Sequence, residues 1–232
     1  MNRIVLRLMA AATTAGLVVL TGCSLEESAS NATGTFPGNY NTTAYAPKNP
    51  GAVKVKVSLQ NSMIYVEEGD KPLLITPCTI GVSEKPTPTG HYAVFEKIKN
   101  KRSGSYGFWV NGNVVVPGES GQAPPGAGYH YVGYPMAYWV GFKPEFGFHA
   151  GPVWPVGHSH GCIRIHPNVA PKFFALVHSG TPVIIEGSLP EDSGVGAKVK
   201  RPDDYKLPDP PGTYMVSAAV FKDPAGPLLV NQ

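Results

Sequence analysis

The stretch from Phe146 to Pro167 reads FGFHAGPVWPVGHSHGCIRIHP. It contains four of the seven histidines, one of the three cysteines and one arginine, in a chain in which only 15% of the residues are charged. Turn-forming residues stand in its middle, at Gly151, Pro152, Pro155 and Gly157. They predict a loop that joins two structured segments and brings the two ends of the stretch together.

Such a loop can place the imidazole of His149 beside the thiol of Cys162, thirteen positions later (162 − 149). A nucleophilic cysteine acts as its thiolate, so it needs a neighbouring base and backbone donors for the oxyanion that forms when it attacks an acyl group. Gly161 allows the tight backbone turn that points N–H groups at a carbonyl. We predict that Cys162 is a nucleophile and that His149 is its base.

A metal site is the alternative for the same residues. His158, His160 and Cys162 alternate along the stretch, with His149 and His166 near them. Zinc sites typically use a Cys-x-x-Cys or a His-Glu-x-x-His motif, and this sequence has neither. We therefore predict no metal here.

These residues resemble the active-site signature of the L,D-transpeptidase catalytic domain, also called the YkuD domain. The signature is a His, a short loop, Ser/Thr-His-Gly-Cys, an apolar residue, and Arg or Asn. Here it is His149, then Ser159-His160-Gly161-Cys162-Ile163-Arg164. The loop is shorter than in many members, and His-Ala-Gly replaces the common His-Gly-Thr, which bears on acceptor preference. The segment Pro86-Thr87-Pro88-Thr89-Gly90 is similar to a second marker of the family.

The resemblance implies a mostly β fold with short helices, like a sandwich or barrel, and chemistry that needs no cofactor. Cys162 would attack the donor carbonyl and hold the acyl group as a thioester, and His149 would transfer the protons. Gly161 and Cys162 would provide backbone N–H groups for the oxyanion. Ser159 and His160 would shape and polarise the site.

The resemblance also implies a substrate, the peptidoglycan stem peptide, which loses a terminal D-Ala when the acyl-enzyme forms. Arg164 would bind a donor carboxylate or brace the loop by hydrogen bonds. An aromatic run precedes the catalytic His in this family. Tyr138 and Trp139 occupy that place, and we expect them to line the substrate groove together with Trp154.

Other functions remain as alternatives. Water as the acceptor would make the protein an L,D-carboxypeptidase or amidase of the same fold, and an envelope protein as the acceptor would become attached to the wall. A non-catalytic tether that binds peptidoglycan is an alternative of another class. Papain-like peptidases place Cys before His. Sortases share the order His, Cys, Arg but have a Thr-Leu-x-Thr-Cys strand, which is absent here.

Residues 1–22 have the layout of a bacterial signal peptide, with Arg3 and Arg7 before an apolar run. The run Leu20-Thr21-Gly22-Cys23 resembles a lipobox, so we expect a lipidated Cys23 and a membrane anchor. Ser24, rather than Asp, favours the outer membrane, facing the periplasm. Residues 23–50 are rich in Ser, Asn, Thr, Gly and Pro, which predicts a flexible tether.

We assign residues 51–188 to the catalytic domain. Alternation predicts a strand at 53–58, and two apolar runs around a Gly/Asp/Pro turn predict a hairpin over 62–81. A strand at 91–95, a helix at 169–176 capped by Asn168, and a strand at 182–186 follow. We expect residues 163–165 to lead into that helix. The Pro-rich extension, residues 189–232, contains one strand-like island at 214–221, and its composition leaves open whether it packs or is disordered.

The composition excludes some partners. A net charge of +3 and a pI near 8.7 are too mild to indicate nucleic acid, and we expect a monomer. Besides Cys23, the cysteines are Cys78 and Cys162. A disulfide between them is possible in an exported protein but would block the nucleophile. Because Cys78 lies in an apolar run, we predict a buried core residue.

Overall fold

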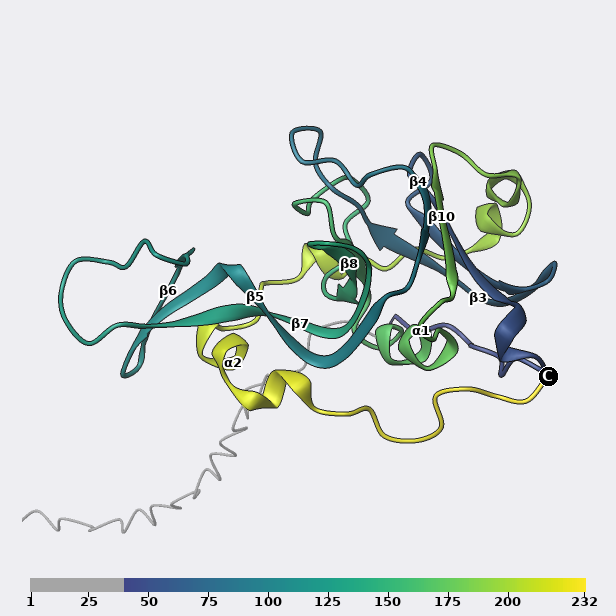
Figure 1. Ribbon diagram of the computed structural model, residues 1–232. Coiled ribbons are helices and arrows are strands. Elements are labelled where there is room, and N and C mark those ends of the chain that lie inside the picture. The colour runs from purple at the N-terminus through teal and green to yellow at the C-terminus, as the bar shows by residue number, and fades with distance from the viewer. Residues whose placement is uncertain (1–39) are drawn as a thin grey trace, which may run out of the picture. The chain divides into compact units, whose positions relative to one another are not determined.

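The computed structural model describes residues 40–232. The predicted signal peptide, the lipidation site Cys23 and most of the predicted tether lie outside the described residues. The described residues belong to one compact unit built on a ten-stranded sheet with short helices (Figure 1). The predicted mostly β fold class is confirmed.

The strands of the sheet have the order β4-β10-β1-β2-β3-β9-β8-β7-β5-β6. Their bounds are β1 (Val53–Ser58), β2 (Met63–Glu68), β3 (Lys71–Thr79), β4 (Gly90–Ala93), β5 (Glu96–Asn111), β6 (Val114–Glu119), β7 (His130–Lys143), β8 (Phe146–Ala150), β9 (Ile163–Ile165) and β10 (Pro182–Glu186).

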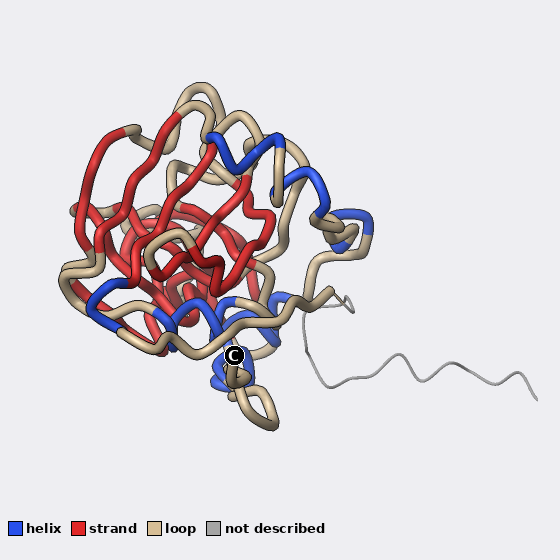
Figure 2. Tube along the Cα trace, turned by 90° about the vertical axis from the view of Figure 1, so that its right-hand side faces the viewer, coloured by secondary structure: helices blue, strands red, loops and turns tan. Residues whose placement is uncertain are grey.

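The helices are short and lie outside the strands (Figure 2). The two α-helices are α1 (Ala170–Leu176) and α2 (Gly212–Val216), and the 3-10 turns are η1 (Pro50–Ala52), η2 (Pro190–Ser193), η3 (Gly196–Lys198), η4 (Asp204–Lys206) and η5 (Ala218–Phe221). Within residues 40–232, no helix has the length and apolar character needed to cross a membrane.

Local patterns account for the first half of the sheet. In β1 the valines at 53, 55 and 57 are buried while the lysines between them are partly exposed, as a period of two requires. Strands β2 and β3 pair antiparallel across the predicted turn, where Gly69 has a φ of 62°. The predicted strand at 53–58, the hairpin and the strand at 182–186 are confirmed.

The core lies between the sheet and α1. Phe173 of α1 contacts Phe148 of β8, with ring centroids 4.7 Å apart, and both side chains are fully buried. The helix predicted at 169–176 is therefore present. The predicted cap is wrong, because Val169 is the N-cap residue and the Asn168 amide instead donates to the carbonyl of Tyr40 at 3.0 Å.

Residues 163–165 form a strand and do not lead into the helix. Strand β9 pairs antiparallel with β3 and parallel with β8, so it closes the sheet between them. Ile163 and Ile165 are buried on one face, while Arg164 lies on the other. A three-residue strand has too short a pattern to be predicted from alternation alone.

The C-terminal extension packs on the domain. The predicted strand-like island at 214–221 is wrong, because α2 and η5 occupy it. Met215 and Val220 are buried against Phe108 and Val110 of β5. The guanidinium of Arg102, also in β5, donates to the carbonyls of residues 215, 216 and 217, which satisfies groups that the end of α2 leaves free.

The last part of the predicted tether also packs on the domain. Ala44 is buried in the core, and the Tyr45 N–H donates to the Leu73 carbonyl at 2.9 Å. The N–H of Val230 donates to the carbonyl of Ala44, and the N–H of Ala46 donates to that of Val230, both at 2.9 Å. The folded unit thus includes residues before 51 and after 188.

Candidate active site

Strands β8 and β9 place the predicted nucleophile and base on one face of the sheet. His149 pairs with Arg164 and Phe148 with Ile163 in the parallel register. Phe148 and Ile163 are fully buried in the core. Because side chains alternate along a strand, His149, Arg164 and Cys162 lie on the opposite face. The loop of residues 151–158 returns the chain from β8 to β9, as its glycines and prolines predict.

The imidazole of His149 is buried and held in one orientation. Its side chain is 4% exposed, and its Nδ1 lies 2.9 Å from the carbonyl oxygen of Ala150. A carbonyl accepts a hydrogen bond, so Nδ1 carries the proton and Nε2 keeps the lone pair. Burial, and then the charge of Arg164, lowers the pKa of His149 to about 4. His149 is therefore a neutral imidazole that can accept a proton.

Cys162 lies directly before β9 and is partly exposed. Its Sγ is 3.6 Å from the carbonyl of Glu145. Burial raises the pKa of the Cys162 thiol, and the backbone of Gly147, Arg164 and Lys101 offset part of that rise. The resting pair is thus a thiol and a neutral imidazole.

Ser159 fixes the turn that leads to Cys162. Its buried hydroxyl donates to the Cys162 carbonyl at 2.6 Å and accepts from the Gly161 N–H at 3.1 Å. The Gly161 N–H is therefore used inside the turn, which contradicts its predicted place in the oxyanion hole. The Cys162 N–H remains as the predicted donor. Gly161 has a φ of 106°, and a Cβ there would lie 2.6 Å from the Phe146 ring.

Two residues that the sequence did not single out as functional hold this turn from the other side. The buried hydroxyl of Thr87 donates to the carbonyl of Gly161 at 3.0 Å and accepts from the N–H of Gly81 at 2.9 Å. Gly81 lies so close to Gly161 that a Cβ at position 81 would be 2.9 Å from its Cα. Thr87 belongs to the second family marker, 86–90, which was the available signal.

His160 lies at the rim of the site. Its ring is 4.4 Å from that of Tyr106, whose hydroxyl is 2.9 Å from the ammonium of Lys85. Partial burial lowers the pKa of His160, and the charges of Lys85 and Arg164 lower it further. The exposed His160 is thus an uncharged ring at a rim whose positive charges are those of Lys85 and Arg164.

Arg164 carries a positive charge without a described acid partner. Among residues 40–232 its guanidinium forms no ion pair, and its buried Nε has no hydrogen-bond partner. Its stem packs beside Gly151, where a Cβ would lie 3.2 Å from the Arg164 Cδ. Arg164 lies two residues after Cys162. Its guanidinium can therefore bind a carboxylate of a substrate near the thiol through charge-assisted hydrogen bonds.

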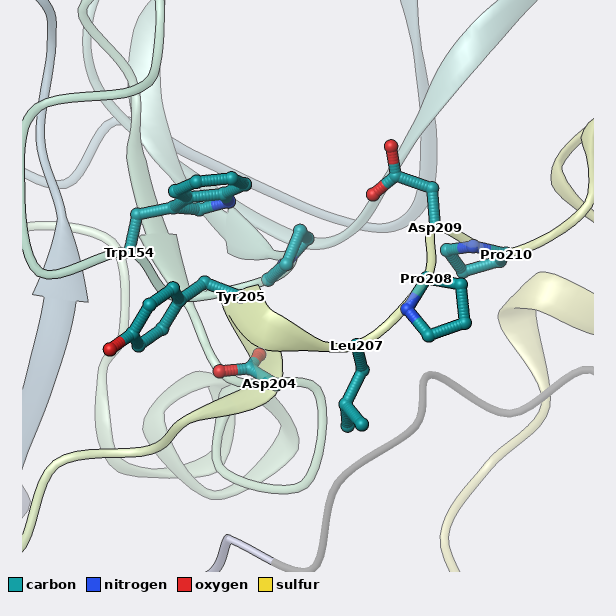
Figure 3. A pocket seen from close by; sticks show the side chains of 8 residues that line it. Trp154, Asp204, Tyr205, Leu207, Pro208, Asp209 and Pro210 are labelled. Carbon is teal, nitrogen blue, oxygen red and sulfur yellow. The ribbon is translucent and has the colours of Figure 1, made fainter.

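The C-terminal extension holds the loop of residues 151–158. Trp154 stacks on His158, with ring centroids 4.0 Å apart, and contacts the ring of Tyr205 at 5.7 Å. The Asp204 carboxylate accepts from the Val153 N–H at 3.1 Å. Figure 3 shows Trp154, Asp204 and Tyr205 around one pocket, which Pro152, Leu207, Pro208, Asp209 and Pro210 also line.

The prediction that Tyr138 and Trp139 line the substrate groove is wrong. Trp139 is 2% exposed, and its indole stacks behind His149, with ring centroids 6.4 Å apart. Tyr138 is 8% exposed, and its hydroxyl donates to Asp223 at 2.8 Å, in a different pocket that α1 and the C-terminal segment line. The dense packing of this aromatic run buries both rings.

The remaining ligand-type residues do not gather. Among the described residues, no group of three His, Cys, Asp or Glu side chains is arranged to hold a metal ion. Cys78 and Cys162 are both free thiols. Cys78 is fully buried in β3, as predicted, and burial raises its pKa to about 12.

The fold and the site define a mostly β protein that presents a thiol and a buried imidazole from two adjacent parallel strands. The model of the YkuD family, the L,D-transpeptidase catalytic domain, matches residues 52–185. The chain belongs to this family. No curated protein matches the sequence.

Solved structures of the family are similar in part. An L,D-transpeptidase from Mycobacterium smegmatis is 18% identical with a TM-score of 0.44, and the match covers 58% of each chain. One from Stackebrandtia nassauensis is 20% identical with a TM-score of 0.43, covering 63% of this chain and 60% of that one. This chain spans less than two thirds of the length of both. The catalytic domain from Enterococcus faecium is 25% identical with a TM-score of 0.42, covering 58% of this chain and 96% of that one.

Proposed function

We propose that this member of the L,D-transpeptidase family transfers acyl groups between peptidoglycan stem peptides through a thioester on Cys162. The observation that carries the proposal is the neutral, oriented imidazole of His149 on the strand beside Cys162. A bound metal or a binding groove alone would not require this pair. The products are crosslinks between stems or an envelope protein attached to a stem.

The first half-reaction removes the terminal D-Ala of the donor. His149 Nε2 takes the proton of the Cys162 thiol as the sulfur attacks the carbonyl of the third residue of the stem. The C–S bond forms, the backbone N–H of Cys162 stabilises the oxyanion, and the C–N bond to D-Ala breaks. The imidazolium returns its proton to the leaving amine.

In the second half-reaction a neutral acceptor amine attacks the thioester. His149 Nε2 takes a proton from the attacking nitrogen, the C–N bond forms, and the C–S bond breaks. The sulfur leaves as a thiolate that recovers the proton from the imidazolium. Water in place of the amine would give an L,D-carboxypeptidase, and this outcome is tested together with the transfer.

Arg164 provides the means to recognise the donor. Stem peptides carry free carboxylates, and the guanidinium of Arg164 has no described acid partner two residues from the nucleophile. A charge-assisted hydrogen bond from this group would fix the donor carbonyl over the thiol. Ser159 stabilises the turn that leads to Cys162, and His160 lies at the rim of the site.

The place of action follows from the sequence. We propose that Cys23 is lipidated and anchors the protein to the outer membrane, facing the periplasm, where peptidoglycan stems lie within reach. The protein acts as a monomer and requires no cofactor.

The test uses a soluble form of residues 24–232 with purified disaccharide-tetrapeptide, analysed by mass spectrometry beside Cys162→Ala. The expected results are an adduct on Cys162, released D-Ala, and then crosslinked dimer. The variants His149→Gln and Arg164→Met separate the roles. His149→Gln is expected to slow acylation about 1,000-fold, within the range that general base catalysis contributes together with positioning. Arg164→Met is expected to act mainly through donor affinity.

Each other result identifies a different function. Tripeptide without dimer, at any acceptor concentration, identifies a carboxypeptidase. Folded protein with a free thiol that forms neither adduct nor product contradicts the stem-peptide donor. A peptidoglycan sedimentation assay then distinguishes a non-catalytic tether, which would bind the polymer equally well with Cys162→Ala.

A further inference from the structure

Three side chains behind the site contact one another, and the proposed reaction gives none of them a role. The Oε1 atom of Glu96 in β5 accepts from the indole N–H of Trp139 at 2.6 Å and from the ammonium of Lys101 at 3.1 Å. The same ammonium lies 4.4 Å from the centroid of the Trp139 ring. One carboxylate oxygen thus fixes both an aromatic ring and a cation that rests on it.

The indole in turn touches the floor of the site. A Cβ at Gly147 would lie 2.7 Å from its six-membered ring, so the indole fills the space that residue 147 leaves free. The ring also lies nearly parallel to the His149 imidazole, at an interplanar angle of 26°. Gly147 is opposite Cys162 when the β8–β9 register is extended by one residue. Trp139 therefore packs beside the base and against the residue that lies opposite the nucleophile.

Two cations act on Cys162 from different elements. Burial raises the pKa of the Cys162 thiol, and the positive charges of Arg164 and Lys101 lower it. Arg164 lies two residues after Cys162, whereas Lys101 lies in β5, with its ammonium over the indole that packs against Gly147. His149 lies on the neighbouring strand β8 as a neutral imidazole, and Glu96 neutralises part of the Lys101 charge. The Lys101 and Glu96 side chains are about one third exposed or less, at 27% and 33%. Their charges are therefore only partly screened by water.

We propose that Lys101 is a positioning residue of this site: held by Glu96 on the indole of Trp139, its ammonium stabilises the thiolate of Cys162. Because Glu96 pairs with Lys101, it reduces the positive electrostatic potential that Lys101 produces at the Cys162 sulfur. The inference rests on the proposed function for the role of Cys162 as nucleophile, but thiolate formation itself requires no stem peptide.

The test measures the rate of Cys162 alkylation by iodoacetamide against pH in the soluble full domain. Lys101→Met is expected to raise the apparent pKa of the thiol by about one unit, because a partly buried cation is lost. Glu96→Gln is expected to lower the pKa, because Lys101 is no longer neutralised while the amide oxygen still accepts from the indole. The two variants thus move the profile in opposite directions, which a purely structural role would not do.

Matched controls keep the test decisive. Lys99→Met removes the same charge from the same strand, but Lys99 pairs with Asp223 and is not among the charges that act on Cys162, so it should leave the profile unchanged. Lys101→Arg keeps the positive charge and should show the wild-type pH profile. It therefore provides a second test of the charge if Lys101→Met folds poorly. Equal profiles for Lys101→Met, Lys99→Met and wild type would overturn the inference. An unreactive stem peptide with these shifts intact would overturn only the proposed function.

Discussion

Gly161 has a backbone conformation that other residues rarely adopt. Its φ of 106° and the nearby Phe146 ring predict that Gly161→Ala loses about 1–3 kcal/mol of unfolding free energy and most of its acylation rate. Urea unfolding and the Cys162 acylation assay measure both. Gly226→Ala is the control, because Gly226 has a φ of 87° with no atom within 4 Å of a Cβ. Equal losses of activity in the two variants would contradict this interpretation.

Two buried histidines make the stability depend on pH. Burial lowers the pKa of His166 to about 4, as it does for His149. Both values lie below the 6.5 of an unfolded histidine, so the unfolded chain binds more protons between these limits. The stabilisation is complete above about pH 6.5 and is lost as the pH falls toward 4, by up to about 3 kcal/mol for each histidine.

His166→Asn tests this dependence on stability alone. An Asn oxygen can replace Nδ1 as acceptor for the Asn168 N–H, which His166 binds at 3.1 Å. The slope of unfolding free energy against pH, measured by urea titration between pH 7.5 and 4.5, is expected to fall by about one proton. An unchanged slope would show that His166 is protonated equally in both states.

At the scale of single residues, the sequence predicted the nucleophile and the base better than it predicted the side chains that surround them. Cys162 and His149 were predictable because a loop between turn-formers joins them locally. Thr87 contacts a carbonyl 74 positions away, and Glu96 contacts an indole 43 positions away. No local pattern encodes such contacts. Trp139 was singled out for the wrong reason, since its ring is buried beside His149 and does not face a groove.

Among the elements, the segment of residues 80–90 supports the catalytic turn. Thr87→Val keeps the shape of the side chain but leaves the Gly161 carbonyl and the Gly81 N–H without a partner. We expect a loss of about 2 kcal/mol in unfolding free energy and a clear loss of acylation rate. Thr87→Ser retains the hydroxyl and should behave nearly as wild type. The comparison requires only thermal unfolding and the adduct assay.

Element prediction succeeded where the pattern is local. The alternation in residues 53–58 and the turn at Gly69 were enough to predict β1, β2 and β3, which are consecutive in the chain and pair with their neighbours. Strand β9 was missed because its three residues are too few for a local pattern, and its antiparallel partner β3 lies far from it in the chain. Helix α2 was missed because Arg102, more than 110 positions earlier, binds its terminal carbonyls.

For the whole molecule, the two ends of the folded unit belong to one structure. A form that begins at residue 51 loses buried Ala44 and the backbone bonds of residues 44–46 with Leu73 and Val230. We expect it to unfold at least about 2 kcal/mol more easily than residues 40–232. Differential scanning calorimetry of the two forms measures this. Equal stability of the two forms would show that residues 40–50 belong to the flexible tether that composition predicts.

Composition predicted a tether through residue 50 because polar, Pro-rich and Gly-rich segments cannot form a core by themselves. Here the segment does not need its own core. The side chain of Ala44 is buried in the core of the domain, and the Pro-rich extension supplies Val230 as a backbone hydrogen-bond partner. Such segments are ordered by a surface that the rest of the chain builds, which their own sequence does not reveal.

The hydrogen bonds that hold residues 40–46 on the domain also determine where a pulling force would first act on the folded unit. A pull on the chain ahead of Tyr40 reaches first the amide of Asn168 and the ammonium of Lys172, which hold residues 40–42 beside α1. The hydrogen bonds with Val230 come next. Strands β8 and β9 are not among these first attachments. With the proposed lipid anchor at Cys23, a pulling force would therefore act first on the edge of the folded unit and not on the strands that carry His149 and Arg164.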